Sequence, residues 1–369
     1  MKKILFTANT LRHLYLCHLP YFSYFKEMGY EVHTASDDDL KLDNVDKSFK
    51  LSIKRTPYSF KNIKAIFELV KILKDNKYEI IHTHTPMGAV VTRLAMMLIR
   101  KKGTKIVYTA HGFHFFKGCP IWYYVLYYPV EKILSRYTDM IITINREDYE
   151  FAKKHFKTNI RYILGVGFNE DKLKTKLSKK EVLEFKKSIG LDYNDYVISY
   201  VAEISKRKRH DYLLKTISRM NITNEKFLFI GDSSNIKKIK KLIDRYNLSK
   251  IVHIIGFNAE ISKYLDISDL IVSVSRQEGL PLNIMEAMYK EKPIIVTDCR
   301  GNRDLIKNNV NGLVVDLNDQ EGFVSAVYYL KNNKEIANKF SCKNKKIVRK
   351  YSIKFILPKM KLIYKELMR

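Results

Sequence analysis

The stretch Ser273-Val-Ser-Arg-Gln-Glu-Gly-Leu-Pro-Leu-Asn-Ile-Met-Glu-Ala-Met-Tyr289 decides the fold. The apolar run Leu270–Val274 predicts a buried strand, and the polar residues Ser275–Gly279 predict a loop. Pro281 suits the first position of a helix, because an amide hydrogen at that position has no partner anyway. A strand that passes through a short loop into a helix is typical of an α/β domain with a parallel sheet.

Two carboxylates flank this turn: Glu278 precedes it, and Glu286 lies one turn inside the expected helix. The free amides at the helix start and the positive end of the helix dipole favour phosphate. A carboxylate on each side can accept hydrogen bonds from hydroxyl groups. The arrangement suits a nucleotide sugar, in which two hydroxyl-bearing rings are joined through phosphate. The spacing alone is equally compatible with an ordinary strand-to-helix junction whose glutamates are solvated.

The composition is that of a folded protein with room for two domains, since 46% of the 369 residues are hydrophobic. The net charge of +28 indicates attraction to a polyanion or an anionic membrane surface, or simply a lysine-rich proteome. The chain has no arginine-rich tail, which argues against nucleic acid. No apolar segment reaches the roughly 18–20 residues that a bilayer span requires. The scattered cysteines favour a reduced, cytoplasmic compartment and no zinc site: Cys17, Cys119, Cys299 and Cys342.

Short apolar runs alternate with amphipathic segments along the whole chain, which predicts two doubly wound parallel sheets. We expect domains over 1–170 and 171–351, and a closing helix over 352–369. The expected strands of the first domain are Lys3–Ala8, Tyr30–Ala35, Phe49–Ile53, Glu79–Thr83, Lys105–Thr109, Met140–Ile144 and Arg161–Leu164. Those of the second are Tyr196–Val201, Lys226–Ile230, Ile251–Ile255, Leu270–Val274 and Pro293–Thr297.

Ligands bind such sheets at the carboxyl ends of the strands, and a chain with two of them favours the cleft between the domains. The run Glu203–His210 follows a strand, and its basic side chains Arg207 and Lys208 suit a diphosphate. A solvated basic loop is the other interpretation. Gly256, before Phe257, ends another strand, where a planar base could approach the backbone.

His111 lies in a glycine-flanked turn just after a strand, where it could bond a sugar hydroxyl or stabilise charge. A histidine satisfied by the backbone is the alternative. His82, His84 and His114 could form a metal cluster with it, but no carboxylate or cysteine spacing supports one. We therefore expect no metal site.

The block Trp122–Tyr128 is dense in aromatic residues, which suit either a protein core or a membrane interface. Basic residues beside exposed aromatics favour anionic lipid surfaces, whereas a solvated lysine face is the plainer alternative. The basic residues of this half are Lys54, Lys61, Lys64, Lys71, Lys74, Lys77, Arg100, Lys101, Lys102 and Lys105.

The combination of motifs resembles bacterial family 4 retaining glycosyltransferases of the GT-B fold, above all those of capsule, exopolysaccharide or O-antigen assembly. The resemblance covers nearly the whole chain. It rests on Thr109-Ala-His-Gly-Phe113, on Lys206-Arg-Lys208, and on the E-x7-E pair Glu278 and Glu286 with Gly-Leu-Pro between them. It implies two Rossmann-like domains facing a central cleft, the first binding acceptor and the second nucleotide sugar, with the closing helix crossing back to the first domain.

The resemblance also assigns roles to residues. Glu278 and His111 would be catalytic, Glu278 at the donor sugar and His111 at the donor or its developing charge. Glu286 would accept hydrogen bonds from the ribose, and Lys208 matches the family's phosphate-binding lysine. Ala202-Glu203-Ile204 stands where the family has G-R-L, so Arg207 would supply the missing charge. Further donor contacts would come from Gly256, Phe257, Gly279, Leu280, Pro281 and Leu282, and acceptor contacts from Asn9, His13 and His18.

The implied activity is that of a metal-independent hexosyltransferase with no cofactor besides its UDP-sugar donor. It would move a hexosyl or N-acetylhexosaminyl group, with retention, to a saccharide on polyprenyl diphosphate. It would be cytoplasmic, peripheral on the inner face of an anionic membrane, and without a nucleic-acid partner. Two alternatives stay open: a UDP-sugar 2-epimerase on the same fold, and a basic polyanion-binding protein without catalysis, whose binding would depend steeply on salt.

Overall fold

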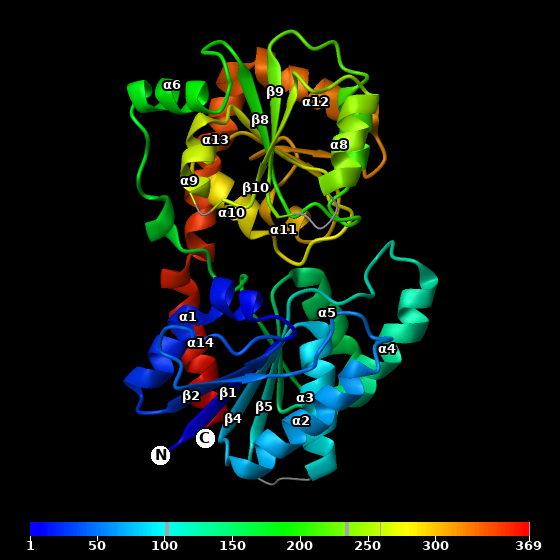
Figure 1. Ribbon diagram of the computed structural model, residues 1–369, viewed down its shortest axis with the longest axis vertical. Coiled ribbons are helices and arrows are strands. Elements are labelled where there is room, and N and C mark those ends of the chain that lie inside the picture. Colours follow the sequence, from blue (N-terminus) through cyan, green and yellow to red (C-terminus); the bar gives the residue numbers. More distant parts are fainter. Residues whose placement is uncertain (100–102, 233–235, 259, 369) are drawn as a thin grey trace. The chain divides into compact units, whose positions relative to one another are not determined.

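The computed structural model describes residues 1–99, 103–232, 236–258 and 260–368. The chain divides into two compact units, one of Met1–Gly167 with Ile353–Arg369 and one of Phe168–Ser352 (Figure 1). Of the basic residues counted above, Arg100, Lys101 and Lys102 lie outside the described residues. No helix among the described residues is long and apolar enough to cross a membrane.

Unit 1 is built on a seven-stranded parallel sheet with the order β3-β2-β1-β4-β5-β6-β7. The order reverses between β1 and β4, which makes the carboxyl ends of these two strands the expected binding crevice of the unit. The strands are β1 Lys3–Thr7, β2 Glu31–Ser36, β3 Lys47–Lys50, β4 Ile80–His84, β5 Lys105–Ala110, β6 Met140–Thr143 and β7 Asn159–Tyr162. The helices are α1 Leu11–Glu27, α2 Lys61–Asp75, α3 Pro86–Ile99, α4 Ile121–Ser135 and α5 Arg146–His155.

Unit 2 has a six-stranded parallel sheet with the order β10-β9-β8-β11-β12-β13, which reverses between β8 and β11. The strands are β8 Tyr196–Val201, β9 Glu225–Ile230, β10 Val252–Gly256, β11 Leu270–Ser273, β12 Ile294–Thr297 and β13 Leu313–Val315. The helices are α6 Lys179–Ser188, α7 His210–Ile217, α8 Ile236–Arg245, α9 Ile261–Ile267, α10 Leu282–Tyr289, α11 Asn302–Leu305, α12 Gln320–Asn332 and α13 Lys334–Val348, with short 3-10 turns η1 Glu170–Leu173 and η2 Arg349–Tyr351.

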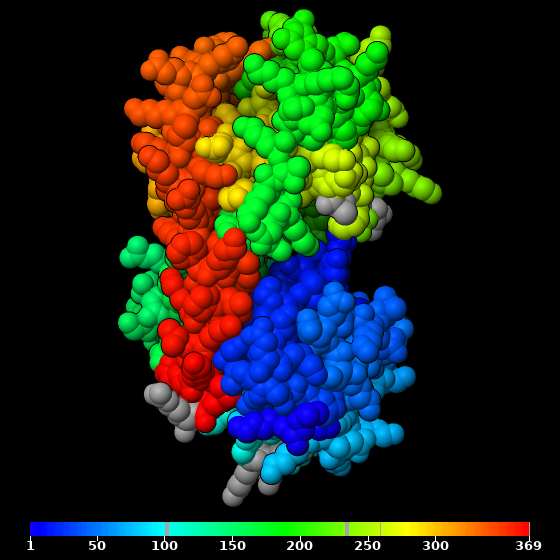
Figure 2. Space-filling model, turned by 90° about the vertical axis from the view of Figure 1, so that its left-hand side faces the viewer, coloured from blue at the N-terminus to red at the C-terminus, as the bar shows by residue number. Residues whose placement is uncertain are grey.

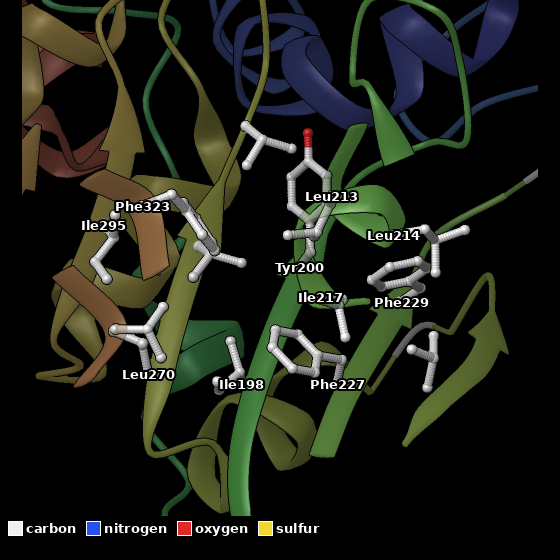
Figure 3. Packing of buried hydrophobic residues seen from close by; sticks show 14 of the residues in the cluster. Ile198, Tyr200, Leu213, Leu214, Ile217, Phe227, Phe229, Leu270, Ile295 and Phe323 are labelled. Atoms are coloured by element: carbon white, nitrogen blue, oxygen red, sulfur yellow. The ribbon is translucent and has the colours of Figure 1, made fainter. Parts of the chain in front are cut away.

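The core of unit 2 lies between this sheet and the helices on its face. Figure 3 shows Phe227 and Phe229 of β9 beside Leu213 and Ile217 of α7, all of them buried. Burying a side chain of this size stabilises the fold by about 1.5–3 kcal/mol relative to exposing it. The alternating apolar residues of adjacent parallel strands therefore hold β8 and β9 in register beneath α7.

The last helix, α14 Ile353–Leu367, returns to unit 1, as predicted. Its Tyr364 is fully buried, packs edge-on against Phe25 at a centroid distance of 4.8 Å and bonds His82 Nδ1 at 2.6 Å. Figure 2 shows α14 in red against the N-terminal residues in blue. The two Rossmann-like sheets and the crossing helix confirm the predicted fold class.

Three local predictions were wrong. The strand expected at Phe49–Ile53 is β3, Lys47–Lys50, because Leu51 and Ile53 are buried beneath α2 instead of joining the ladder. The edge strand β13 was not predicted, since three residues give no periodic signal. Pro281 precedes α10 in an extended conformation, with ψ of 117°, so the helix begins at Leu282.

Candidate active site

The stretch that decides the fold lies where the strand order of unit 2 reverses. The loop after β11 carries Glu278, and the neighbouring strand β8 leads into the basic run that carries Arg207 and Lys208. Because carboxyl ends of parallel strands meet at one edge of a sheet, these loops lie side by side. The sheet thus brings together residues about seventy positions apart.

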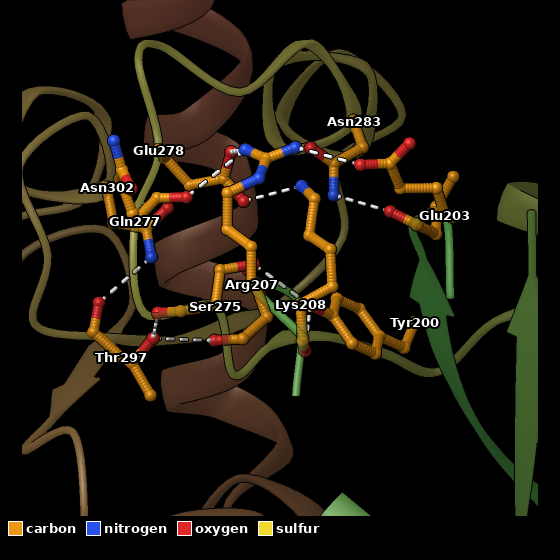
Figure 4. A network of polar contacts seen from close by, with 12 residues as sticks. Tyr200, Glu203, Arg207, Lys208, Ser275, Gln277, Glu278, Asn283, Thr297 and Asn302 are labelled. Atoms are coloured by element: carbon orange, nitrogen blue, oxygen red, sulfur yellow. Dashed lines mark hydrogen bonds and ion pairs between the residues drawn. The ribbon is translucent and has the colours of Figure 1, made fainter. Parts of the chain in front are cut away.

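Glu278 is the centre of a buried ion cluster (Figure 4). Its Oε1 accepts a hydrogen bond from Lys208 Nζ at 2.5 Å, and its Oε2 lies 3.3 Å from Arg207 Nη1. The side chains of Glu278 and Lys208 are only 5% and 9% exposed. Burial acts to raise the pKa of Glu278, but the Lys208 ammonium and the Arg207 guanidinium outweigh it and hold that pKa below its usual range. Glu278 is therefore a carboxylate at neutral pH.

Arg207 also turns toward the residue that departs from the family pattern. Its Nη2 lies 3.1 Å from Glu203 Oε1, and its Nη1 donates to the carbonyl of Gln277 at 3.2 Å. The guanidinium therefore stands over the same loop as Lys208. The role of Arg207 at a diphosphate stays a prediction, since its guanidinium is paired with Glu203 and Glu278.

Backbone and hydroxyl contacts join the two loops. Tyr200 of β8 donates from its hydroxyl to the Lys208 carbonyl at 2.7 Å, and the same hydroxyl lies 2.9 Å from Ser275 Oγ. Thr297 at the end of β12 donates to the Ser275 carbonyl at 2.6 Å. The basic run and the Glu278 loop are thereby fixed to three neighbouring strands, which preorganises their charges.

Close backbone packing fixes the far side of the Glu278 loop. A Cβ placed on Gly301 would lie 2.4 Å from the Gly279 carbonyl oxygen, so this position accepts only glycine without movement of the loop. The buried Arg300 donates from Nε to the Glu278 carbonyl at 3.1 Å. Tyr200, Ser275 and Arg300 were not predicted as site residues from the sequence. Of the three, only Arg300 offered a signal, as part of an Arg-Gly pair after a strand.

Glu286 lies on α10 in a different environment from Glu278. It is partly buried, and burial raises its pKa to about 7, although Lys172 acts in the opposite direction. The described residues offer its carboxylate no hydrogen bond. The two glutamates of the E-x7-E pair therefore differ in charge near neutral pH, Glu278 being ionised and Glu286 about half protonated.

The remaining predicted donor residues lie along the same edge of the sheet. Leu280 and Pro281 are buried between the Glu278 loop and α10, and Leu282 opens the helix. Gly256 ends β10 with a φ of +77°, and its carbonyl accepts from Gly231 N at 2.8 Å. Phe257 beside it is 63% exposed. This pair lies on the far side of β9 from β8.

In unit 1 the structure assembles histidines from three elements. His111 follows β5, His84 ends β4, and His13 and His18 lie on α1. His111 Nε2 lies 3.0 Å from His13 Nε2 and 3.4 Å from His84 Nδ1. Burial lowers the pKa of His13 to about 4 and that of His111 well below its usual value. At neutral pH His111 is thus a neutral imidazole, which can donate a hydrogen bond but carries no charge.

Of the other histidines considered from the sequence, His82 packs on His84 with ring centroids 4.1 Å apart, whereas His114 packs on Tyr127 of α4. His82 uses both ring nitrogens, on Tyr364 and on Thr109 at 2.7 Å, and His114 stacks on Tyr127 at 4.5 Å. Asn9, which was predicted to contact acceptor, is buried beside α1, and its backbone amide donates to Thr85 Oγ1 at 2.9 Å.

Two family models match the chain along most of its length. The model described as glycosyl transferase 4-like matches residues 3–145, and the model described as glycosyl transferases group 1 matches residues 181–347. EpsD of Bacillus subtilis strain 168, a protein assigned to the glycosyltransferases, is 36% identical over 367 residues that cover 98% of this chain and 96% of EpsD. This chain belongs to the glycosyltransferases.

A second relative of this glycosyltransferase is the UDP-Gal:alpha-D-GlcNAc-diphosphoundecaprenol alpha-1,3-galactosyltransferase of Escherichia coli. It is 29% identical over 331 residues, which cover 87% of this chain and 84% of the relative. Both relatives are named as glycosyltransferases, which favours a transferase over the epimerase and polyanion-binding alternatives.

Solved structures establish the fold of the glycosyltransferase as GT-B. HepE from Anabaena, solved in complex with UDP and glucose, superposes with a TM-score of 0.81 at 16% identity and covers 99% of this chain and 100% of its own. Sucrose-phosphate synthase from Thermosynechococcus elongatus gives a TM-score of 0.79, also at 16% identity, covering 100% of this chain and 99% of its own.

Proposed function

We propose that this glycosyltransferase moves a hexosyl or N-acetylhexosaminyl group from a UDP-sugar to a saccharide carried on polyprenyl diphosphate, with retention at the anomeric carbon. The observation that carries the proposal is the cluster of the buried Lys208 and Glu278 with the partly exposed Arg207, beside the loop that leads into α10. Two cations and a helix N-terminus at one point suit the diphosphate of a departing nucleotide. The name of the Escherichia coli relative, with its UDP-Gal donor and diphosphoundecaprenol acceptor, supports the substrate classes.

In this proposal Lys208 and Arg207 stabilise the negative charge that develops on the leaving UDP. Glu278, ionised and held in place by both cations, accepts hydrogen bonds from the donor sugar. Glu286 accepts from the ribose hydroxyls, and the backbone of 279–282 lies along the sugar and diphosphate. Gly256 and Phe257 lie beside the base. These basic groups replace a divalent metal in the transfer step.

Unit 1 would supply the acceptor side and one catalytic contact. The neutral imidazole of His111 donates a hydrogen bond to the donor sugar, and Asn9, His13 and His18 contribute acceptor contacts. We assign no protein general base, since the leaving phosphate itself can help to deprotonate the acceptor hydroxyl.

The exposed face of α4 would bring the enzyme to its lipid-linked acceptor. Ile121, Trp122 and Val125 are 78%, 50% and 72% exposed, whereas Tyr124 and Tyr128 pack inward on Phe115. Helix α2 of the same unit carries four exposed lysines: Lys61, Lys64, Lys71 and Lys74. Aromatic and aliphatic side chains beside lysines suit the surface of an anionic membrane on its cytoplasmic side.

The deciding experiment is a panel of UDP-sugars offered with a polyprenyl-diphosphate saccharide, with the products analysed by NMR. We expect transfer from one UDP-sugar with an unchanged anomeric configuration. A free sugar product epimerised at C2, or transfer with inversion, would refute the proposal. Full donor affinity in both Lys208→Ala and Glu286→Ala would show that the donor site lies elsewhere.

A further inference from the structure

Four imidazoles of unit 1 converge at the switch point of its sheet. This histidine cluster consists of His13 and His18 on α1, His84 at the end of β4 and His111 after β5. One ring nitrogen of each lies within 4.8 Å of those of the other three. The cluster draws its rings from helix α1, from the end of strand β4 and from the loop that follows β5.

The spacing within the cluster is that of metal ligands. A tetrahedral zinc ion with Zn–N bonds of about 2.0–2.1 Å sets its ligand nitrogens about 3.3–3.4 Å apart. The His13 Nε2–His111 Nε2 and His111 Nε2–His84 Nδ1 distances are 3.0 and 3.4 Å. Two edges of a tetrahedron are thus already formed, and a modest shift of the His18 ring would bring in a fourth nitrogen.

Unpartnered nitrogens also point to a missing ligand. Both ring nitrogens of His18 are buried and have no hydrogen-bond partner among the described residues. His18 is 2% exposed and His84 is fully buried. Nearly all buried polar groups in proteins are satisfied, so these nitrogens require an explanation. His82, two residues before His84, has both nitrogens bonded and needs none.

The ligand chemistry selects a class of metal. A neutral imidazole offers one lone-pair nitrogen to a metal ion, and the four rings of the cluster can together supply the four ligands of a tetrahedral site. Imidazole ligands without carboxylates favour Zn²⁺, Co²⁺, Ni²⁺ or Cu²⁺ over Mg²⁺ and Mn²⁺. His13 and His111 are partly exposed, which gives an ion a route to the cluster.

We propose that the histidine cluster binds one divalent transition-metal ion, with Zn²⁺ as the best match, through His13, His84 and His111 and with His18 as the fourth ligand. The proposal departs from the expectation of no metal site. That expectation relied on ligand spacing along the chain, whereas the parallel strand order brings these distant positions together. We propose no metal for the transfer step itself, although the ion would bind residues that the proposed function places at donor and acceptor.

The test uses the full chain, stripped with a chelator and titrated with Co²⁺, Zn²⁺ and Mg²⁺. We expect one Co²⁺ per chain, with the strong visible absorption of a tetrahedral site, displacement of Co²⁺ by Zn²⁺, and no calorimetric signal with Mg²⁺. His84→Phe and His13→Phe keep a ring of similar size and remove the ligand nitrogens, so each should weaken Co²⁺ binding at least tenfold.

Two controls keep the test decisive. His114→Phe changes a partly exposed ring that stacks on Tyr127, and His155→Phe changes a partly buried ring on α5; both should bind Co²⁺ as the wild type does. Circular dichroism reports whether each variant folds. If His84→Phe does not fold, the variant His13→Phe, at a partly exposed position, still tests the proposal. Co²⁺ binding that is absent in the wild type, or equal in wild type and His13→Phe, would overturn the proposal.

A consequence for activity follows, and it rests on the proposed function. The ion would occupy the His111 nitrogen that faces the cluster, so Zn²⁺ should inhibit transfer and a chelator should restore it. If Zn²⁺ binds the cluster and transfer is unaffected, the metal site stands and the role of His111 at the donor is wrong.

Discussion

At the scale of single residues, the Lys208–Glu278 pair links stability to function. Both side chains are buried, and removing Lys208 leaves the Glu278 carboxylate with only the partly exposed Arg207 as its counterion, which costs up to about 3–5 kcal/mol. We expect Lys208→Met to lower the free energy of unfolding by this amount and to abolish transfer. The double variant Lys208→Met with Glu278→Gln should regain most of the stability and none of the activity.

Chemical denaturation and transfer assays on the same preparations check this prediction. Lys206→Met is the matched control, because Lys206 belongs to the same basic run but is exposed. It should change the free energy of unfolding by less than about 0.5 kcal/mol. Activity in the double variant would show that the cluster has only a structural role.

Glu286 should make donor binding depend on pH. Its pKa in the folded enzyme, about 7, lies above the ordinary glutamate value of 4.5, so folding favours the protonated acid. Its contribution to stability is therefore complete below about pH 4.5 and is lost as pH rises to 7. The affinity for the donor should change with pH in the opposite direction and rise as pH rises, since the ionised carboxylate is the better acceptor for ribose hydroxyls. We expect KM for the donor to fall about tenfold between pH 6 and 8.

Steady-state kinetics across this range, compared with Glu286→Gln, tests that expectation. The amide cannot ionise, so the variant should have a high and pH-independent KM. Glu291→Gln, on the turn after α10, should retain the wild-type profile. An identical profile in Glu286→Gln would assign the titration to another group.

Residue patterns predicted part of this site and not the rest. The E-x7-E pair and Lys208 are contiguous signals, so they were recognisable. Tyr200 and Ser275 act through a bond between neighbouring strands, which no local pattern contains. The histidine cluster could not be predicted for the same reason, since only the strand order shows that its members lie close together.

At the scale of elements, α4 shows how one helix can serve two environments. Its inward tyrosines complete an aromatic core, while its outward face stays apolar and exposed. The core interpretation of the aromatic block is confirmed for the inward face, and membrane contact stays a prediction for the outward face. The sequence block alone could not separate them, because the burial of each face depends on packing against β5 and α5.

The outward face of α4 gives a direct test of membrane contact. Val125→Glu places a charge on that face and should weaken sedimentation with anionic vesicles about tenfold at low salt. Tyr193→Glu is the matched control, because Tyr193 is 73% exposed in unit 2 and Val125 is 72% exposed. Equal sedimentation of the two variants would show that α4 does not contact the membrane. Failure of the wild type to bind vesicles at low salt would show that the protein makes no such membrane contact at all.

Elements were predictable where the hydrophobic period was clear. The bounds of β8 agree with the prediction, because six alternating or buried residues lie between polar turns. The error at β3 arose because Leu51 and Ile53 are core residues without being strand residues. Apolar character predicts burial, and hydrogen-bond pairing has to be supplied by a neighbouring strand.

At the scale of the whole molecule, two units with separate cores should respond separately to ligand and mutation. Tyr364→Phe removes the hydroxyl that bonds the buried His82, which costs about 1–3 kcal/mol. We expect it to lower the melting temperature of unit 1 alone. UDP should raise the melting temperature of unit 2, since a ligand stabilises the unit it binds.

Differential scanning calorimetry with and without UDP separates these effects. Tyr193→Phe, at an exposed position, should leave both transitions unchanged. If UDP raised the transition that Tyr364→Phe lowers, the donor would be stabilising unit 1, contrary to the proposed function.

The return of α14 to unit 1 also sets the order in which the two units can finish folding during synthesis. Unit 2 is one continuous segment, Phe168–Ser352, and can close as soon as it leaves the ribosome. Unit 1 begins at Met1 but lacks the partner of His82 until Tyr364 has been synthesised. Unit 1 is thus translated first but completes its folding last. A nascent chain released before α14 has been made would have an incompletely folded unit 1 and a folded unit 2.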